Sequence, residues 1–141
     1  MIYNEVHKDL FSVDKSYYLA QCIASDFRMG AGIAVQFQKK FSLRDELIKT
    51  GKENTFPGSC VLIKRVLNLI TKRRSSGKPT YETLKSSLLN MKHLCIAFNI
   101  TKIAMPKIGC GLDRLQWGKV KEMLHETFND MPIEILVCVW R

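Results

Sequence analysis

The sequence has no C-x-x-C pair, no internal repeat and no long apolar run. Its cysteines are odd in number and scattered, which disfavours a disulfide framework and a zinc ribbon. No stretch reaches the roughly 18 apolar residues that a membrane helix needs, and no basic segment followed by an apolar one opens the chain. These absences predict a reduced, soluble, intracellular protein, cytoplasmic or nuclear, with no membrane partner and no metal site. The cysteines are Cys22, Cys60, Cys95, Cys110 and Cys138.

Acidic residues are scarce beside basic ones. Thirteen Asp and Glu stand against 22 Lys and Arg, which leaves a formal net charge of +9. This balance favours anionic partners such as phosphates, nucleotides or nucleic acid, and it equally fits an ordinary basic protein. The 141 residues suffice for one domain, and a hydrophobic share of 46% supports a core, which excludes disorder for the bulk of the chain. We therefore expect a single domain over residues 1–141, and a monomer.

Extended and helical patterns alternate along the chain. Residues 17–24 are almost all apolar, which is typical of a strand covered on both faces. After Thr80, a suitable N-cap, apolar residues recur at helical spacing as far as Phe98. This order of elements predicts an α/β sandwich on one central, mixed sheet. The expected strands are 2–6, 17–24, 60–64, 66–71, 102–105 and 133–140, and the expected helices are 33–41, 43–49, 80–98 and 117–128.

Two short glycine loops, 29–32 and 108–111, each follow an expected strand and precede a helix. Glycine lets the backbone approach a ligand closely, and the N-terminus of a helix offers N–H groups to an anion. Ligands of open α/β sheets bind at the carboxyl ends of strands, so both loops are candidates for one site. Neither is a dinucleotide fingerprint or a Walker A loop. Taken alone, each is equally explained as a tight turn.

Lys72 and Asp113 are the two charged residues in this pattern that are candidate catalytic groups. Lys72 comes directly after an expected buried strand, with two arginines beside it. Neighbouring cations and desolvation favour the neutral amine, which is the nucleophilic form. The alternative is a solvated charge run or a nucleic-acid contact. Asp113 follows the second glycine loop, where it is a candidate general acid/base or, alternatively, a partner of Arg114 or a helix cap.

Three further side chains are weaker candidates. Asp9 follows the first expected strand, where it either accepts a hydrogen bond from the amino group of a base or makes a turn. Cys110 stands between two glycines and is either a thiol nucleophile or an inert packing residue. Trp140 either flanks a base or belongs to the core or its rim.

Four segments together resemble a known family. They are QCIASDFRMGAGIA at 21–34, LITKRR at 69–74, KPTYE at 78–82 and MPKIGCGLDRLQW at 105–117. They resemble the macrodomain, and within it the terminal ADP-ribose protein glycohydrolase branch, which includes the antitoxin macrodomains that reverse DNA ADP-ribosylation. The match runs in order from about Tyr3 to the end of the chain.

The resemblance implies a three-layer α/β/α sandwich that binds ADP-ribose above the sheet. It implies removal of mono-ADP-ribose from acidic protein side chains or DNA bases, with deacylation of O-acyl-ADP-ribose as a further activity. Lys72 would attack the ribose and Asp113 would move the proton, with no zinc, magnesium or nicotinamide cofactor. The partners would be ADP-ribose and ADP-ribosylated protein or DNA. With Trp140 added, the expected binding residues are Asp9, Leu10, Ala24, Arg28, Met29, Gly30, Ala31, Gly32, Ile33, Lys107, Ile108, Gly109, Cys110, Gly111 and Leu112.

The family pattern divides these residues among the parts of the ligand. Asp9 would recognise the adenine amino group with help from the Leu10 backbone, residues 28–34 would line the distal ribose, and the backbone of 108–112 would cradle the phosphates. Lys8 and Ala24 depart from the pattern, which puts the preferred substrate in question. Two alternatives stay open: a non-catalytic ADP-ribose reader and a basic nucleic-acid-binding module.

Overall fold

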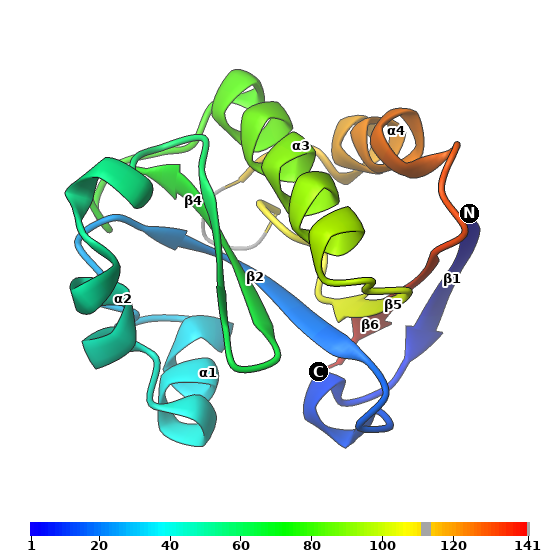
Figure 1. The fold of residues 1–141 in the computed structure, drawn as a ribbon, viewed down its shortest axis with the longest axis horizontal. Coiled ribbons are helices and arrows are strands. Elements are labelled where there is room, and N and C mark those ends of the chain that lie inside the picture. The colour runs from blue at the N-terminus through cyan, green and yellow to red at the C-terminus, as the bar shows by residue number, and fades with distance from the viewer. Residues whose placement is uncertain (111–113, 141) are drawn as a thin grey trace.

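A computed structural model describes residues 1–110 and 114–140 of the chain (Figure 1). Its strands and helices alternate in the order expected from the sequence. The strands are β1 (Ile2–His7), β2 (Tyr18–Ala24), β3 (Cys60–Ile63), β4 (Val66–Lys72), β5 (Lys102–Met105) and β6 (Glu134–Val139). The helices are α1 (Ile33–Phe41), α2 (Arg44–Thr50), α3 (Tyr81–Ala97) and α4 (Trp117–Phe128), with short 3-10 turns at Leu10–Ser12 and Lys52–Asn54.

The six strands form one mixed sheet in the order β1-β6-β5-β2-β4-β3. Every neighbouring pair is parallel except β3 and β4, which form an antiparallel hairpin. The central strands β2 and β4 are almost wholly buried, as their continuous apolar sequences predict. The carboxyl ends of β1, β6, β5, β2 and β4 therefore lie along the same edge of the sheet.

Helices cover both faces of this sheet and make three layers. One buried cluster joins α3 and α4 to one face, and a second joins α1 and α2 to the other. Figure 1 shows α3 and α4 together on one side of the long strand β2, and α1 and α2 on the other. The observed architecture confirms the expected α/β/α sandwich with a central mixed sheet.

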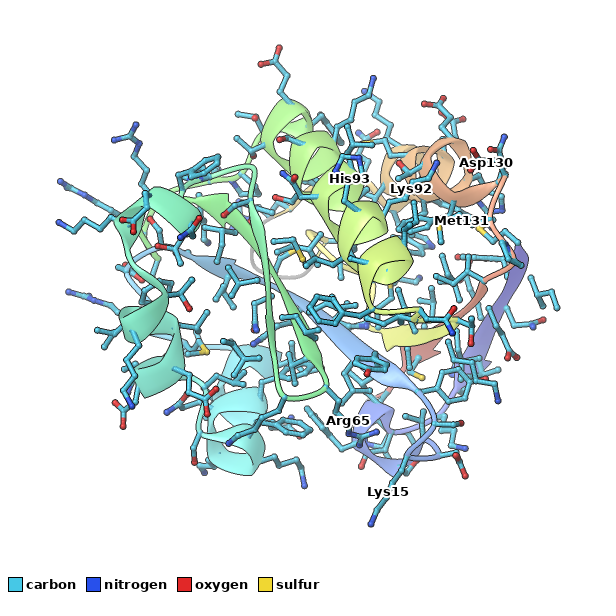
Figure 2. All side chains as sticks on the ribbon, in the orientation of Figure 1. Lys15, Arg65, Lys92, His93, Asp130 and Met131 are labelled. Atoms are coloured by element: carbon cyan, nitrogen blue, oxygen red, sulfur yellow. The ribbon has the colours of Figure 1, made fainter. Side chains whose placement is uncertain are left out.

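The α3 helix is built as its sequence pattern predicts. The Thr80 hydroxyl accepts a hydrogen bond from the Thr83 N–H at 3.0 Å, and the Thr83 hydroxyl reaches back to the Thr80 backbone, which completes a capping box. On its outer side, Lys92 pairs with Asp130 at 2.8 Å, and Figure 2 shows the two side chains beside each other. The helix is thus held at its start and along its length.

Several predicted boundaries were wrong by one residue, and two of these matter for the site. β4 extends through Lys72, so this lysine ends the strand instead of following it. β6 ends at Val139, so Trp140 lies outside the sheet with 68% of its surface exposed. No helix among residues 1–110 and 114–140 is long and apolar enough to cross a membrane.

Candidate active site

Most of the predicted site residues lie at one edge of the sheet, because each follows or ends a parallel strand. Asp9 and Leu10 come after β1, and Trp140 comes after β6. The segment 106–110 follows β5, the segment 25–32 follows β2, and Lys72 ends β4. Parallel strands carry these segments to the same side of the sheet. Gly111, Leu112 and Asp113 lie outside the described residues.

The neighbouring strands β2 and β5 send the chain to opposite faces of the sheet. From β2 it continues into α1 on one face, and from β5 it continues into α4 on the other. Such a divergence between adjacent strands opens a crevice beyond their carboxyl ends, where ligands of open α/β sheets bind. The two glycine loops are the segments that diverge at this point.

The loop between β2 and α1 holds an unusual backbone conformation. Phe27 and Met29 are buried yet have positive φ angles of 55° and 46°. Gly32, the N-cap of α1, has φ 62° and ψ −151°, a region open essentially to glycine alone. The N-cap is a glycine, so it has no side chain of its own to cap the start of α1. Backbone N–H groups at such a helix start suit an anionic ligand.

Arg44 of α2 holds the same loop from outside. Its Nε donates a hydrogen bond to the Phe27 carbonyl at 2.7 Å, and a second guanidinium N–H donates to the Arg28 carbonyl. By fixing these two carbonyls, the bonds help to hold the loop in the conformation with positive φ angles at Phe27 and Met29. The sequence analysis missed Arg44, because nothing in its local sequence marks a contact 16 residues away.

Lys72 is positioned through its backbone by the end of β2. The register of β2 and β4 shifts at this point, so that Ile23 pairs with Ile70 and Ala24 with Lys72. The Ser25 N–H donates to the Lys72 carbonyl at 2.9 Å, and the Ser25 hydroxyl donates to the Arg73 carbonyl at 3.0 Å. The lysine side chain is half-buried. Its backbone is therefore fixed against the strand that begins the first glycine loop.

Asp26 joins the first glycine loop to the loop after Lys72. Its carboxylate accepts hydrogen bonds from the Ser75 N–H at 2.7 Å, the Ser75 hydroxyl at 2.8 Å and the Arg28 N–H at 3.1 Å. Partial burial alone would raise the Asp26 pKa, but the hydrogen bonds from Ser75 and Arg28 outweigh it and lower that pKa. The sequence analysis missed Asp26 as well, since its partner lies 49 residues away.

Asp26→Asn should loosen both loops. Removing a charged acceptor of backbone N–H groups typically costs about 1 kcal/mol, so we expect a melting temperature lower by about 3 °C. Since the Asp26 pKa is lowered on folding, its contribution is complete above the ordinary value of 3.8 and is lost as the pH falls below it. Thermal melts of both proteins from pH 7 to pH 3 would check this. Curves that stay equally far apart at every pH would contradict it.

The second glycine loop is a tight turn after β5. Gly109 has φ +73°, and a Cβ placed there would lie 3.0 Å from Leu115 Cδ1. The Leu115 N–H donates to the Gly109 carbonyl at 2.7 Å, and the Cys110 N–H donates to the Lys107 carbonyl at 3.2 Å. The Cys110 thiol lies 3.3 Å from the Ile108 carbonyl. The positive φ thus favours glycine at position 109, and a Cβ there would also need a small shift of the Leu115 side chain.

The structure places the adenine-end candidates at the β1 and β6 ends of the site. Asp9 is the N-cap of the turn at Leu10–Ser12, and its carboxylate accepts a hydrogen bond from the Phe11 N–H at 3.0 Å. This is the turn-making role considered above for Asp9. The Lys8 N–H donates to the Val139 carbonyl at 3.1 Å, which holds this segment beside β6. Among the described residues, no group of three or more His, Cys, Asp or Glu could hold a metal ion.

Comparisons with known proteins agree with this fold. The Macro domain family matches residues 12–124. The chain is 48% identical over 136 residues to ADP-ribose glycohydrolase OARD1 of Homo sapiens, covering 94% of this chain and 88% of the relative. It is 24% identical to the DNA ADP-ribosyl glycohydrolase of Mycobacterium tuberculosis, covering 74% of this chain and 32% of that protein. The solved macrodomain of Thermus aquaticus DarG superimposes with a TM-score of 0.87 at 20% identity, covering 98% of each chain.

Proposed function

The chain belongs to the Macro domain family, and we propose from this that it is an ADP-ribosyl glycohydrolase. Its substrates are mono-ADP-ribosylated acidic side chains of proteins or ADP-ribosylated DNA bases. The observation that carries the proposal is that Lys72 ends β4 at the same sheet edge as the two glycine loops. The 48% identity to an ADP-ribose glycohydrolase supports the same reaction class.

In the proposed reaction, the Lys72 amine attacks the anomeric carbon of the distal ribose. The bond from that carbon to the target breaks, and the target leaves with the bonding pair as a carboxylate or a nucleobase. Asp113, by its resemblance to the family's catalytic aspartate, takes the proton from the amine. Water then hydrolyses the lysyl adduct and releases free ADP-ribose. The displacement by Lys72 and the hydrolysis that follows use only the enzyme, the substrate and water.

The surrounding backbone binds the rest of the ligand. The loop before α1, with Gly32 at its end, lines the distal ribose, and the backbone of the turn at Gly109 cradles the diphosphate. Asp9 recognises the adenine amino group at the β1 end, and Trp140, which follows the neighbouring strand β6, flanks the base. The reaction class also covers O-acyl-ADP-ribose, because its ester is attached to the same ribose.

The function is tested by measuring release of free ADP-ribose from two substrates: a glutamate-linked ADP-ribosyl protein and ADP-ribosylated single-stranded DNA. We expect release from at least one, and the faster substrate identifies the target class. Unmodified DNA of the same sequence is the control. Binding of free ADP-ribose without release from either substrate would instead identify a reader. Tight binding of the unmodified DNA without ADP-ribose binding, with a log–log salt slope of several units, would identify a nucleic-acid module.

A further inference from the structure

A cavity lies beside Lys72, on the α3 side of β4. It has a volume of about 520 Å³. It is lined by the end of β4, the loop that follows, and the start of α3, and we call it the basic pocket. Its lining residues include Thr71, Lys72, Arg73, Arg74, Lys78 and Thr83.

The basic pocket is strongly cationic. Four of its lining side chains are lysine or arginine, and none of its described lining residues is acidic. Arg73, Arg74 and Lys78 are exposed to solvent, so their charged groups are free to contact a ligand at the mouth of the pocket. Clustered cations facing a concave surface concentrate anions there, and guanidinium groups match phosphate oxygens in geometry.

A buried hydroxyl that lines the basic pocket has no partner in the described part of the chain. Thr71 is only 1% exposed, and among the described residues its Oγ1 makes no hydrogen bond. Its carbonyl, by contrast, accepts a hydrogen bond from the Thr83 hydroxyl at 2.8 Å. A buried hydroxyl without a partner is unfavourable and calls for an explanation. An acceptor oxygen of a bound anion would satisfy it.

The position of the basic pocket separates it from the expected site of the ADP-ribose diphosphate. Its described lining residues include none from the glycine loops at 29–32 and 108–110. Lys72 lines the basic pocket as well, so the pocket adjoins the residue that the proposed function makes the nucleophile. The start of α3, at Thr80 and Thr83, forms one wall, and its helix dipole favours a negative ligand.

We propose that the basic pocket binds a phosphate group other than the two of ADP-ribose, held by Thr71 Oγ1 and the cations of the loop after β4. This inference rests on the proposed function for the role of Lys72. The phosphate has two sources: a phosphodiester of the modified target or free inorganic phosphate. If the phosphate is a phosphodiester, the pocket contributes to recognition of the modified target. If it is free phosphate, its binding changes the rate of the reaction at Lys72.

The test measures equilibrium binding at constant ionic strength, so that it needs no turnover. The probes are inorganic phosphate and a short unmodified single-stranded DNA, and the proteins are wild type, Thr71→Val and Arg74→Gln. Lys15→Gln is the matched charge control, because Lys15 is exposed and projects at the end of the molecule opposite the start of α3 (Figure 2). We expect both pocket variants to bind the favoured probe roughly tenfold more weakly, and the control to bind like wild type.

Each outcome decides the matter. Weaker binding of DNA by the pocket variants identifies a phosphodiester, and weaker binding of phosphate alone identifies the free ion. Equal binding by all four proteins, or an equal loss in Lys15→Gln, overturns the inference. Thr71→Val should melt no lower than wild type, since the Thr71 hydroxyl has no partner among residues 1–110 and 114–140, whereas a structural role would lower the melting temperature. Free ADP-ribose is titrated in parallel: its failure to bind wild type counts against the proposed function, and not against the pocket.

Discussion

Lys72→Ala should lower the release of ADP-ribose by about three orders of magnitude or more, while binding of free ADP-ribose is retained. Loss of a covalent nucleophile removes the reaction path itself, and such losses are typically of this size or larger. Retained binding follows because the adenine, the diphosphate and most of the ribose are assigned to other segments. Release assays and ADP-ribose titrations on the same preparations would check both halves.

Lys72→Arg separates the charge of the lysine from its nucleophilicity. A guanidinium stays protonated near neutral pH and cannot attack the ribose, so this variant should be as inactive as Lys72→Ala. Lys15→Ala removes an exposed lysine remote from the site and should keep wild-type release. The lysyl adduct exchanges with its ring-opened Schiff base, and borohydride added during turnover should reduce that C=N bond and leave a stable ADP-ribosyl amine on Lys72, visible by mass spectrometry. Substantial release by Lys72→Arg would contradict the nucleophilic role.

Gly32→Ala should both destabilise the protein and weaken ADP-ribose binding. Position 32 has φ 62° and ψ −151°, where a residue with a Cβ is strained by about 1–3 kcal/mol. For a chain of this size, that corresponds to a melting temperature lower by roughly 3–10 °C. Relief of the strain would turn the start of α1, whose N–H groups are assigned to the ligand. Thermal melts and ADP-ribose titrations would measure the two effects.

Gly30→Ala is the matched control for this loop. Gly30 does not have a positive φ, and a Cβ at that position would meet no atom of residues 1–110 or 114–140 within 4 Å. Its melting temperature should therefore equal or slightly exceed that of wild type, because alanine restricts the unfolded chain. If both variants melted alike, the conformation of Gly32 would not be what the stability of this loop depends on.

Local patterns in the sequence were sufficient for most of the fold. The apolar spacing after Thr80 predicted α3 and its cap, and the nearly continuous apolar sequences predicted the central strands β2 and β4. Both signals are local, since periodicity and capping depend on residues within one or two turns of each other. The errors lie at element ends, such as Lys72 and Trp140, where strand pairing and not local preference decides the last residue.

The sequence by itself determined which loops lie at the functional edge. Each glycine loop follows a strand, and parallel strands bring such loops together whatever their exact register. Only the tertiary structure decided how these loops are held. The bonds from Asp26 to Ser75 and from Arg44 to Phe27 join residues 49 and 17 positions apart, and the shift that pairs Ala24 with Lys72 depends on two strands meeting.

The basic pocket was also decided by the tertiary structure. The sequence shows the run of cations after β4, but a charge run alone does not distinguish a solvated surface from a binding site. Packing of α3 against β4 makes that distinction, because it buries the Thr71 hydroxyl beneath the cations and leaves it without a partner among the described residues. The sequence alone therefore shows the cations and the glycine loops. Only long-range packing decides the shape of the pocket that the cations line.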